Sequence, residues 1–458
     1  HHQHPELPKG LDFAAMWHLG AELPYWKSEG RHLHGKRRTN QEQLDYWQYN
    51  QKDSVAALWL SYELDKAASR DVRHQWLSQT WSLAREMTQR GLPLNSHAVK
   101  QAACTIAGMS SASGASITEL TSPAFNPGSP AQVQRQLYGP VAAGGLGLPP
   151  QTVGGRVTTD NDALHQLQIK QPTTLVNALL RHRKLAKLTS SYLQPMEEAG
   201  EMLRCGWTAD GTETMRFTSA QHPLGGGLNA QTIPQYLRHV IVAPPGRLFI
   251  QPDMSQAEAR YVAYRARCTG LIDLFSDPSR NVHLERARWL FGRAVVKSEP
   301  AYRMAKATVH AGNYRMGPKR LSLEIGVPLA QAKKLLASVV ADMPEITAWH
   351  EEVRRLLASR GWLENCWGQR RFFYRAVCMR AATGKLGDEE WKDAIAWEPQ
   401  SAIPQVVNQA LIQLMSPQSN CALWLHAHGH DSFLASVPQD TVESWVTLVQ
   451  AAFSIPLS

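Results

Sequence analysis

The spacing of apolar residues predicts helices through most of the chain. Residues 46–68 and 76–90 repeat apolar positions at intervals of three and four, the pattern of one helix face. The second helix should end just before Gly91, because glycine readily adopts the left-handed conformation of a C-cap. By contrast, residues 107–131 and 139–155 are rich in small residues, glycine and proline, and we interpret both as loops.

A basic helix is predicted within residues 171–196. Thr173 or Thr174 can cap its start, and Pro195 lies just past its expected end. Its polar surface is either a solvated basic face or a face that grips a phosphate backbone. The apolar stripe consists of Leu175, Leu179, Leu185, Leu188 and Tyr192, and the cations are Arg181, Arg183, Lys184 and Lys187.

Strands are predicted in two regions. Residues 238–253 contain two short apolar runs around a Pro-Pro-Gly turn, and residues 421–438 contain two more around a tight turn. Helical patterns run from about 255 to 360 between them. Each strand region presents a carboxylate at a strand end, Asp253 in the first and Asp431 in the second.

Two interpretations of these carboxylates stay open. Asp253 suits a helix N-cap and Asp431 a turn, which is the more common use of a single aspartate. Carboxylates at adjacent strand ends can instead share two magnesium ions about 4 Å apart, which clamp the attacking and leaving oxygens of a phosphoryl transfer. Magnesium needs only one or two protein carboxylates beside substrate phosphates, so two acids suffice.

A second chemical pattern lies on a predicted helix that begins near Pro300, a residue suited to a first helical turn. Arg303, Lys306, His310 and Tyr314 follow at spacings of three and four and so share one face. Two cations followed by two rings match a triphosphate followed by a base. The alternative is a mixed surface helix whose tyrosine lies on the core.

Composition narrows the class of protein. The 458 residues carry a net charge of +9 with a pI near 9.2, which favours a polyanionic partner such as nucleic acid. No apolar run approaches a membrane span, and the six cysteines form no CxxC pair, as in a reducing cytoplasm. The first residues lack a signal peptide and a starting methionine, so we expect a fragment or a processed product.

Several segments, in this order, resemble family A DNA polymerases of the DNA polymerase I type. The run from Asp253 to Arg260 resembles their first carboxylate motif, and His430–Ser432 resembles the second. The helix around Lys306 and Tyr314 is similar to their nucleotide-binding helix. The sequence of residues 398–414, together with His430–Ser432, is most similar to that of bacteriophage polymerases. Further matching segments are residues 214–234, which include Asn229, and residues 361–373 and 398–414.

The resemblance implies a mixed α/β (α+β) fold in the form of a right hand, with an antiparallel palm sheet, a helical thumb and helical fingers. It implies template-directed addition of deoxynucleotides to a primer 3′ end in phage-type replication, inside the cytoplasm of a bacterial host. Residues 1–78 would be a remnant of a 3′–5′ exonuclease domain and residues 79–458 the polymerase domain. The implied parts are a thumb at about 79–205, a palm at about 206–275 and 395–458, and fingers at about 276–394.

The resemblance also implies roles for single residues. Asp253 and Asp431 would hold two Mg²⁺ ions, with the carbonyl of Met254 as a further ligand, and Lys306 would neutralise the triphosphate. Tyr314 would close the pocket, and Glu258 would reject a ribose 2′-hydroxyl. The remaining nucleotide contacts would be Gln256, Arg303 and His310. The implied contacts to primer–template DNA are Arg216, Gln231, Arg260, Gln400, His430, Lys184 and Lys187.

The chain departs from the family pattern at several positions. The arginine usually found four residues before Lys306 is at position 303, where it can still reach a phosphate. Arg315 replaces a glycine that is common after the tyrosine, and Ser432 replaces a common glutamate. Pro404 falls just inside a helix expected after Gln400, so that helix should start late.

Residues 49–53, "YNQKD", resemble the third motif of the 3′–5′ exonuclease domain that accompanies such polymerases. The two earlier motifs would supply the partners of Asp53 in a two-metal nuclease, and the chain begins too late to hold them. We therefore expect no proofreading by this chain as given.

Three alternatives remain open. A catalytically impaired DNA-binding remnant would explain the unusual finger residues. A single-subunit RNA polymerase shares the two-acid palm, although Glu258 speaks against it. His426, His428 and His430 alternate along a strand, so a zinc site is conceivable, but strand surface explains the first two more simply.

Overall fold

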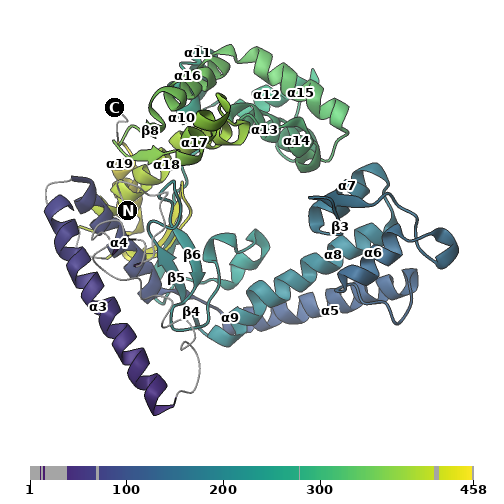
Figure 1. Ribbon diagram of the computed structural model, residues 1–458, viewed down its shortest axis with the longest axis horizontal. Coiled ribbons are helices and arrows are strands. Elements are labelled where there is room, and N and C mark those ends of the chain that lie inside the picture. Colours follow the sequence, from purple (N-terminus) through teal and green to yellow (C-terminus); the bar gives the residue numbers. More distant parts are fainter. Residues whose placement is uncertain are drawn as a thin grey trace.

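The computed structural model describes residues 11, 14–15, 39–68, 72–277, 279–416 and 422–455. Helices dominate, and the central sheet is antiparallel, so the predicted mixed α/β fold is confirmed. Figure 1 shows a helical arm that extends to one side and a second helical lobe above it, with the sheet near the bases of both.

The central sheet has three strands in the order β10-β11-β7, and both pairs are antiparallel. Residue Ala435 of β11 lies opposite Ile250 of β7, and Phe433 lies opposite His428 of β10. One face of the sheet packs against α18 and α4 in an apolar core. The strands are β7 (Arg247–Ile250), β10 (Trp424–His428) and β11 (Phe433–Pro438).

The arm is built mainly from α5 and α8, and the predicted stripe from Leu175 to Tyr192 is buried against its core. Its tip approaches α14 of the other lobe, where Asp162 and Arg320 form an ion pair of 3.5 Å (Figure 1). Its elements are α5 (Ser96–Leu120), α6 (Pro130–Tyr138), β2 (Gln151–Val153), β3 (Arg156–Thr158), α7 (Asn161–Lys170), α8 (Thr174–Leu188) and α9 (Gln194–Ala199).

The first predicted loop, residues 107–131, is wrong in large part. Helix α5 continues to Leu120 because buried Ile106, Ser113 and Ile117 keep a helical spacing that outweighs the small, polar composition. The second predicted loop, residues 139–155, is confirmed for most of its length, and it also contains a short 3₁₀ turn and strand β2. Pro195 does not end the basic helix, since a π-helical turn leads into α9, whose first turn accepts the proline.

The second lobe contains the helix with the predicted nucleotide face, α13, which runs from Pro300 as expected. A large core centred on Trp349 and Trp397 holds α10, α16 and α18 together. The elements are α10 (Ala257–Arg265), α11 (Thr269–Ser276), α12 (Val282–Phe291), α13 (Pro300–Asn313), α14 (Pro318–Ile325), α15 (Leu329–Asp342), α16 (Pro344–Arg360), β8 (Trp362–Glu364), β9 (Arg370–Phe372), α17 (Tyr374–Thr383) and α18 (Asp388–Leu414).

Short elements join these parts. The first strand predicted in residues 238–253 is wrong, because a 3₁₀ helix over Gln235–Val240 occupies its start, while the second is β7. At the base of the arm, β1 pairs with β4 and β5 pairs with β6. Helix α19 packs in the same apolar core as the central sheet. These elements are β1 (Leu92–Pro93), β4 (Met202–Leu203), β5 (Cys205–Thr208), β6 (Thr218–Gln221) and α19 (Val442–Ala452).

The predicted N-terminal helices are confirmed as α3 (Asn40–Ala68) and α4 (Val72–Arg90), and Gly91 follows with a φ of +73°. Helix α3 carries the YNQKD segment, and the exonuclease remnant stays a prediction. Val55, Leu58 and Tyr62 are exposed on α3. Within the described ranges, every helix is too short or too polar to cross a membrane.

Candidate functional site

The fold brings the two predicted carboxylates to one end of the central sheet. Asp253 follows β7 and pairs as an isolated antiparallel bridge with Ser432, in the turn between β10 and β11. The backbone N–H of Met254 donates to the carbonyl of Asp431 over 3.0 Å. The backbones that carry the two acids are therefore joined directly.

The N-cap interpretation of Asp253 is wrong. Helix α10 begins at Ala257, and the residue at its N-cap position is Gln256, with a left-handed φ of 55°. Asp253 lies three residues earlier and is exposed at the sheet edge. The tight turn between strand and helix frees this carboxylate for another use.

One cavity of about 530 Å³ collects most of the predicted catalytic and nucleotide-binding residues. The sheet end and α10 supply one wall, and the predicted face of α13 supplies the other. His310 and Tyr314 meet edge to face, with ring centroids 4.7 Å apart. The predicted residues that line the cavity are Asp253, Met254, Gln256, Glu258, Arg303, Lys306, His310, Tyr314 and Asp431.

Glu258 is held from two sides. Tyr314 donates its hydroxyl to Glu258 Oε2 over 2.7 Å, and Arg216 forms an ion pair of 2.5 Å with Oε1. Burial and the negative charge of Glu258 together raise the pKa of Tyr314 well above its usual value. Because both oxygens are engaged, the Glu258 side chain forms a fixed wall between α10 and α13.

Proline explains how Arg216 is oriented. Pro404 has no N–H, so the carbonyl of Gln400 four residues earlier loses its helical partner. The Nε of Arg216 donates to that carbonyl over 3.2 Å. The expected late start of this helix is wrong, since α18 begins at Asp388 and contains both Pro399 and Pro404.

Burial and neighbouring negative charges shift the pKa of Asp431. Burial first, and then the nearby charges of Asp253 and Glu258, raise the pKa of the Asp431 carboxyl. Its neighbour His430 has a φ of 74°, and burial with the charge of Arg216 lowers the pKa of that histidine to about 4. The site therefore gathers acidic groups that repel one another unless a cation lies between them.

Sequence reasoning missed three polar residues that line the cavity, Glu324 and two buried ones. His283 of α12 and Asn313 of α13 line the cavity, are 6% and 3% exposed, and have ring Nδ1 and side-chain Oδ1 atoms without a hydrogen-bond partner among the described residues. Burial, with the charges of Lys306 and His310, lowers the pKa of His283 to about 4. No local signal in the sequence indicated that His283 would line the cavity, because a single histidine on an amphipathic helix is common.

Some predicted DNA contacts lie outside the cavity. The guanidinium of Arg260 donates to the carbonyls of Ser255 and Phe275, and the amide of Gln231 donates to the carbonyls of Phe217 and His428. Lys184 and Lys187 are exposed on α8 of the arm. Their roles, like that of Gln400, stay predictions.

The prediction that His426 and His428 lie on the strand surface is wrong. His426 and His428 are each 1% exposed, and a bulge between Leu425 and Ala427 breaks the alternation. His426 bonds the carbonyl of Gly91 at 2.8 Å and the hydroxyl of Ser436 at 3.0 Å. Among the described residues, no group of three or more histidine, cysteine, aspartate or glutamate side chains is arranged to hold a metal, so the zinc site is not found.

We expect His428 to make folding stability depend on pH. Burial, and then His430, lowers its pKa to about 3, whereas an unfolded histidine titrates near about 6.5. The folded protein therefore has its full free energy of unfolding above about pH 6.5, where His428 is neutral in both states. This free energy falls as the pH drops toward 3, by up to about 1.4 kcal/mol per pH unit, because the unfolded state binds the proton more readily. Denaturant titrations from pH 7.5 to 5 should show a shallower slope for His428→Phe, and an unchanged slope would contradict the assignment.

Residues 97–456 match DNA polymerase family A, and the chain belongs to that family. It is 26% identical over 412 residues to the thermostable DNA polymerase I of Thermus filiformis, covering 87% of this chain and 46% of the relative. It is 26% identical over 347 residues to DNA polymerase I of Pseudomonas aeruginosa, covering 71% of this chain and 36% of the relative. The chain thus spans about half the length of these relatives or less.

The fold is also that of a solved polymerase structure. The POL domain of Pol1 from M. smegmatis, in complex with DNA primer-template and dNTP, aligns with a TM-score of 0.78 at 20% identity. The alignment covers 100% of this chain and 78% of that chain. The right-hand fold that the sequence implies is therefore confirmed.

Proposed function

We propose that this chain is a template-directed DNA polymerase that adds deoxynucleotides to a primer 3′ end. One observation carries the proposal: a single cavity of about 530 Å³ is lined by both sheet-end carboxylates and by Lys306, Glu258 and Tyr314. These residues come from three regions far apart in the sequence. Phage-type replication is supported by the likeness of residues 398–414 and 430–432 to bacteriophage polymerases.

The residues present fit a magnesium site. Burial raises the pKa of the Asp431 carboxyl, and the nearby charges of Asp253 and Glu258 raise it further, as expected of neighbouring carboxylates without a cation. Two carboxylates match the needs of Mg²⁺, which keeps room for waters and substrate phosphates. Asp253, Asp431 and the carbonyl of Met254 would hold the metal. Bound there, two Mg²⁺ ions would lower the pKa of the primer hydroxyl and stabilise the leaving pyrophosphate.

The chain's own residues supply the rest of the chemistry. Lys306 and Arg303 lie on one exposed face of α13, where they would bind and neutralise the triphosphate. His283 is neutral above about pH 4, and its buried ring would donate a hydrogen bond to a phosphate oxygen. Tyr314 and His310 would orient the base by contact with its plane. Glu258 would exclude a 2′-hydroxyl by occupying its place.

The same proposal assigns the parts of the hand. The arm of α5 to α9 would be the thumb, at about 79–205. The sheet with α10, α11 and most of α18 would be the palm, at about 206–275 and 395–458, and α12 to α17 would be the fingers, at about 276–394. Exposed Lys184 and Lys187 on the thumb, with Gln400 and His430 in the palm, would contact primer–template DNA.

Primer extension tests the proposal. We expect the purified chain to extend a labelled primer on a DNA template when Mg²⁺ and deoxynucleotides are supplied, and to stop when EDTA removes the metal. Ribonucleotides should be used poorly. Duplex binding without any extension would instead favour a catalytically impaired DNA-binding remnant, and preferential use of ribonucleotides would favour an RNA polymerase.

Glu258 should determine the choice of sugar. We expect Glu258→Ala to raise ribonucleotide incorporation relative to deoxynucleotide incorporation by about a hundredfold or more, because the wall between α10 and α13 is removed. The ratio of kcat/KM for the two nucleotides measures this. Glu258→Gln is the matched control, since it keeps the volume and should keep most of the rejection. Equal selectivity in wild type and Glu258→Ala would refute the role.

A further inference from the structure

The residue after Tyr314 has an unusual backbone conformation. Arg315 has a φ of 51°, in the left-handed region that side chains other than glycine rarely adopt. Helix α13 ends one residue before Tyr314, so Arg315 begins the turn toward α14. Such a strained conformation persists only where contacts with neighbouring residues stabilise it.

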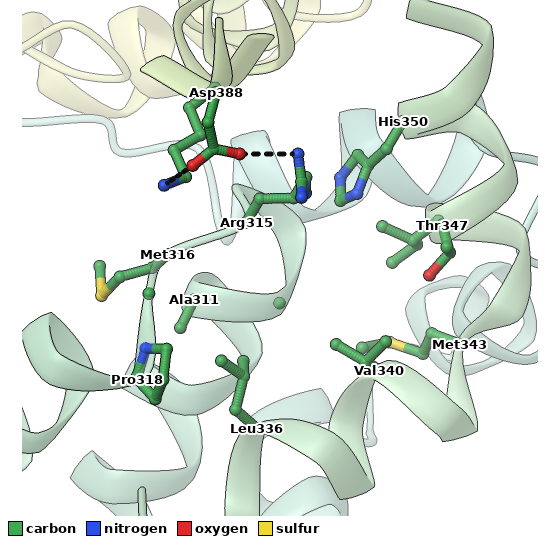
Figure 2. A pocket seen from close by; sticks show the side chains of 14 residues that line it. Ala311, Arg315, Met316, Pro318, Leu336, Val340, Met343, Thr347, His350 and Asp388 are labelled. Carbon is green, nitrogen blue, oxygen red and sulfur yellow. Dashed lines mark ion pairs between the residues drawn. The ribbon is translucent and has the colours of Figure 1, made fainter. Parts of the chain in front are cut away.

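The side chain of Arg315 is anchored on α18. Its guanidinium lies 3.5 Å from the ring centroid of Trp391 and pairs with Asp388 Oδ1 at 3.3 Å. Asp388 in turn pairs with Lys392 at 2.5 Å, as the dashed lines in Figure 2 show. Arginine can stack on an aromatic face and bond a carboxylate in the same position, which lysine does less well.

A second connection ties the same helix end to α16. His350 Nε2 lies 2.8 Å from the carbonyl of Asn313, and the indole N–H of Trp391 donates to the carbonyl of His350 over 2.9 Å. The end of α13, α16 and α18 thus form a closed ring of contacts. Beside this ring, a cavity of about 350 Å³ lies against Ala311 and Arg315 (Figure 2).

Tyr314 lies between two anchors as a result. Its hydroxyl donates to Glu258 on the nucleotide side, while the next residue is fixed to Trp391 and Asp388 on the opposite side. Ala311 and Gly312 line the cavity behind α13, and Gly312 also lies close to Val339 of α15. Tyr314 is 9% exposed in the core around Trp349, and the Arg315 anchor holds the backbone turn that directs its ring toward Glu258.

We propose that Arg315 is a positioning residue for nucleotide binding: its stack on Trp391 and its pair with Asp388 hold the end of α13 so that Tyr314 meets Glu258. The inference rests on the proposed polymerase function. The anchor acts through Tyr314 and does not touch the nucleotide. Loss of the anchor weakens nucleotide binding more than it slows the reaction of bound nucleotide.

Kinetics of two variants test the inference. We expect Arg315→Gly and Arg315→Lys each to raise KM for the correct deoxynucleotide by about tenfold and to change kcat by no more than about twofold. Glycine also relieves the strained φ, so Arg315→Gly should melt at the same temperature as wild type or higher. A purely structural role predicts the reverse, a lower melting temperature with unchanged KM.

The matched control is Arg360→Lys. Arg360 stacks on Trp362 at 4.0 Å in the same lobe and does not line the nucleotide cavity, so this variant should keep the wild-type KM. If wild type extends primers and both Arg315 variants share its KM, the inference is wrong and the proposed function stands. If wild type extends no primer, the proposed function itself fails.

Discussion

Asp431→Asn should reduce primer extension by about a thousandfold or more while duplex binding is retained. The substitution keeps the size of the side chain and removes one of the two carboxylates at the sheet end, so a metal pair there would lose one of its two acidic ligands. Single-turnover extension measures the loss, and a gel-shift titration with primer–template duplex measures binding.

The same variant should be more stable than wild type at neutral pH. Burial and the charges of Asp253 and Glu258 raise the pKa of Asp431, which means that its charged form is unfavourable in the folded protein. The gain should therefore vanish as the pH falls below the unfolded carboxyl value of about 3.9. Asp440→Asn, on an exposed turn after β11, is the control and should change neither property. Full extension by Asp431→Asn would contradict the two-metal site.

The two acids could be predicted from sequence because each depends on local signals. Asp253 and Asp431 each follow a short apolar run that also carries turn residues, and both runs became strands of one sheet. The spacing from Arg303 to Tyr314 likewise predicted one helix face, and that face lines the cavity. The family resemblance added the roles, which neither the spacing nor the strands could supply.

The remaining features depend on contacts between distant segments. The support of Glu258 by Arg216 joins residues 42 positions apart, and the carbonyl that orients Arg216 is freed by a proline in another helix. His283 became a cavity residue only because α12 packs beside α13. In the arm, Ser113 and Ile117 continue the helical spacing of Ile106 into a segment whose glycine and serine content indicated a loop. Composition misled there because packing outweighs local propensity.

Lys306→Ala should lower kcat/KM for deoxynucleotides by about a hundredfold to a thousandfold. Lys306 is the cation at the middle of the α13 face, where charge would build on the triphosphate, and alanine leaves that charge without a fixed partner. Lys333→Ala, on exposed α15 of the same lobe, removes one positive charge without touching the cavity and should keep wild-type kinetics.

A second readout of Lys306→Ala does not depend on catalysis. Burial, and then the charge of Lys306, lowers the pKa of His283, so removing Lys306 should raise that pKa above about 4. Histidine ring signals in an NMR titration would report the change, and Lys333→Ala should leave them in place. A normal rate with a raised His283 pKa would show that Lys306 lies where the fold puts it but does not act on the triphosphate, and the proposed role would then pass to Arg303.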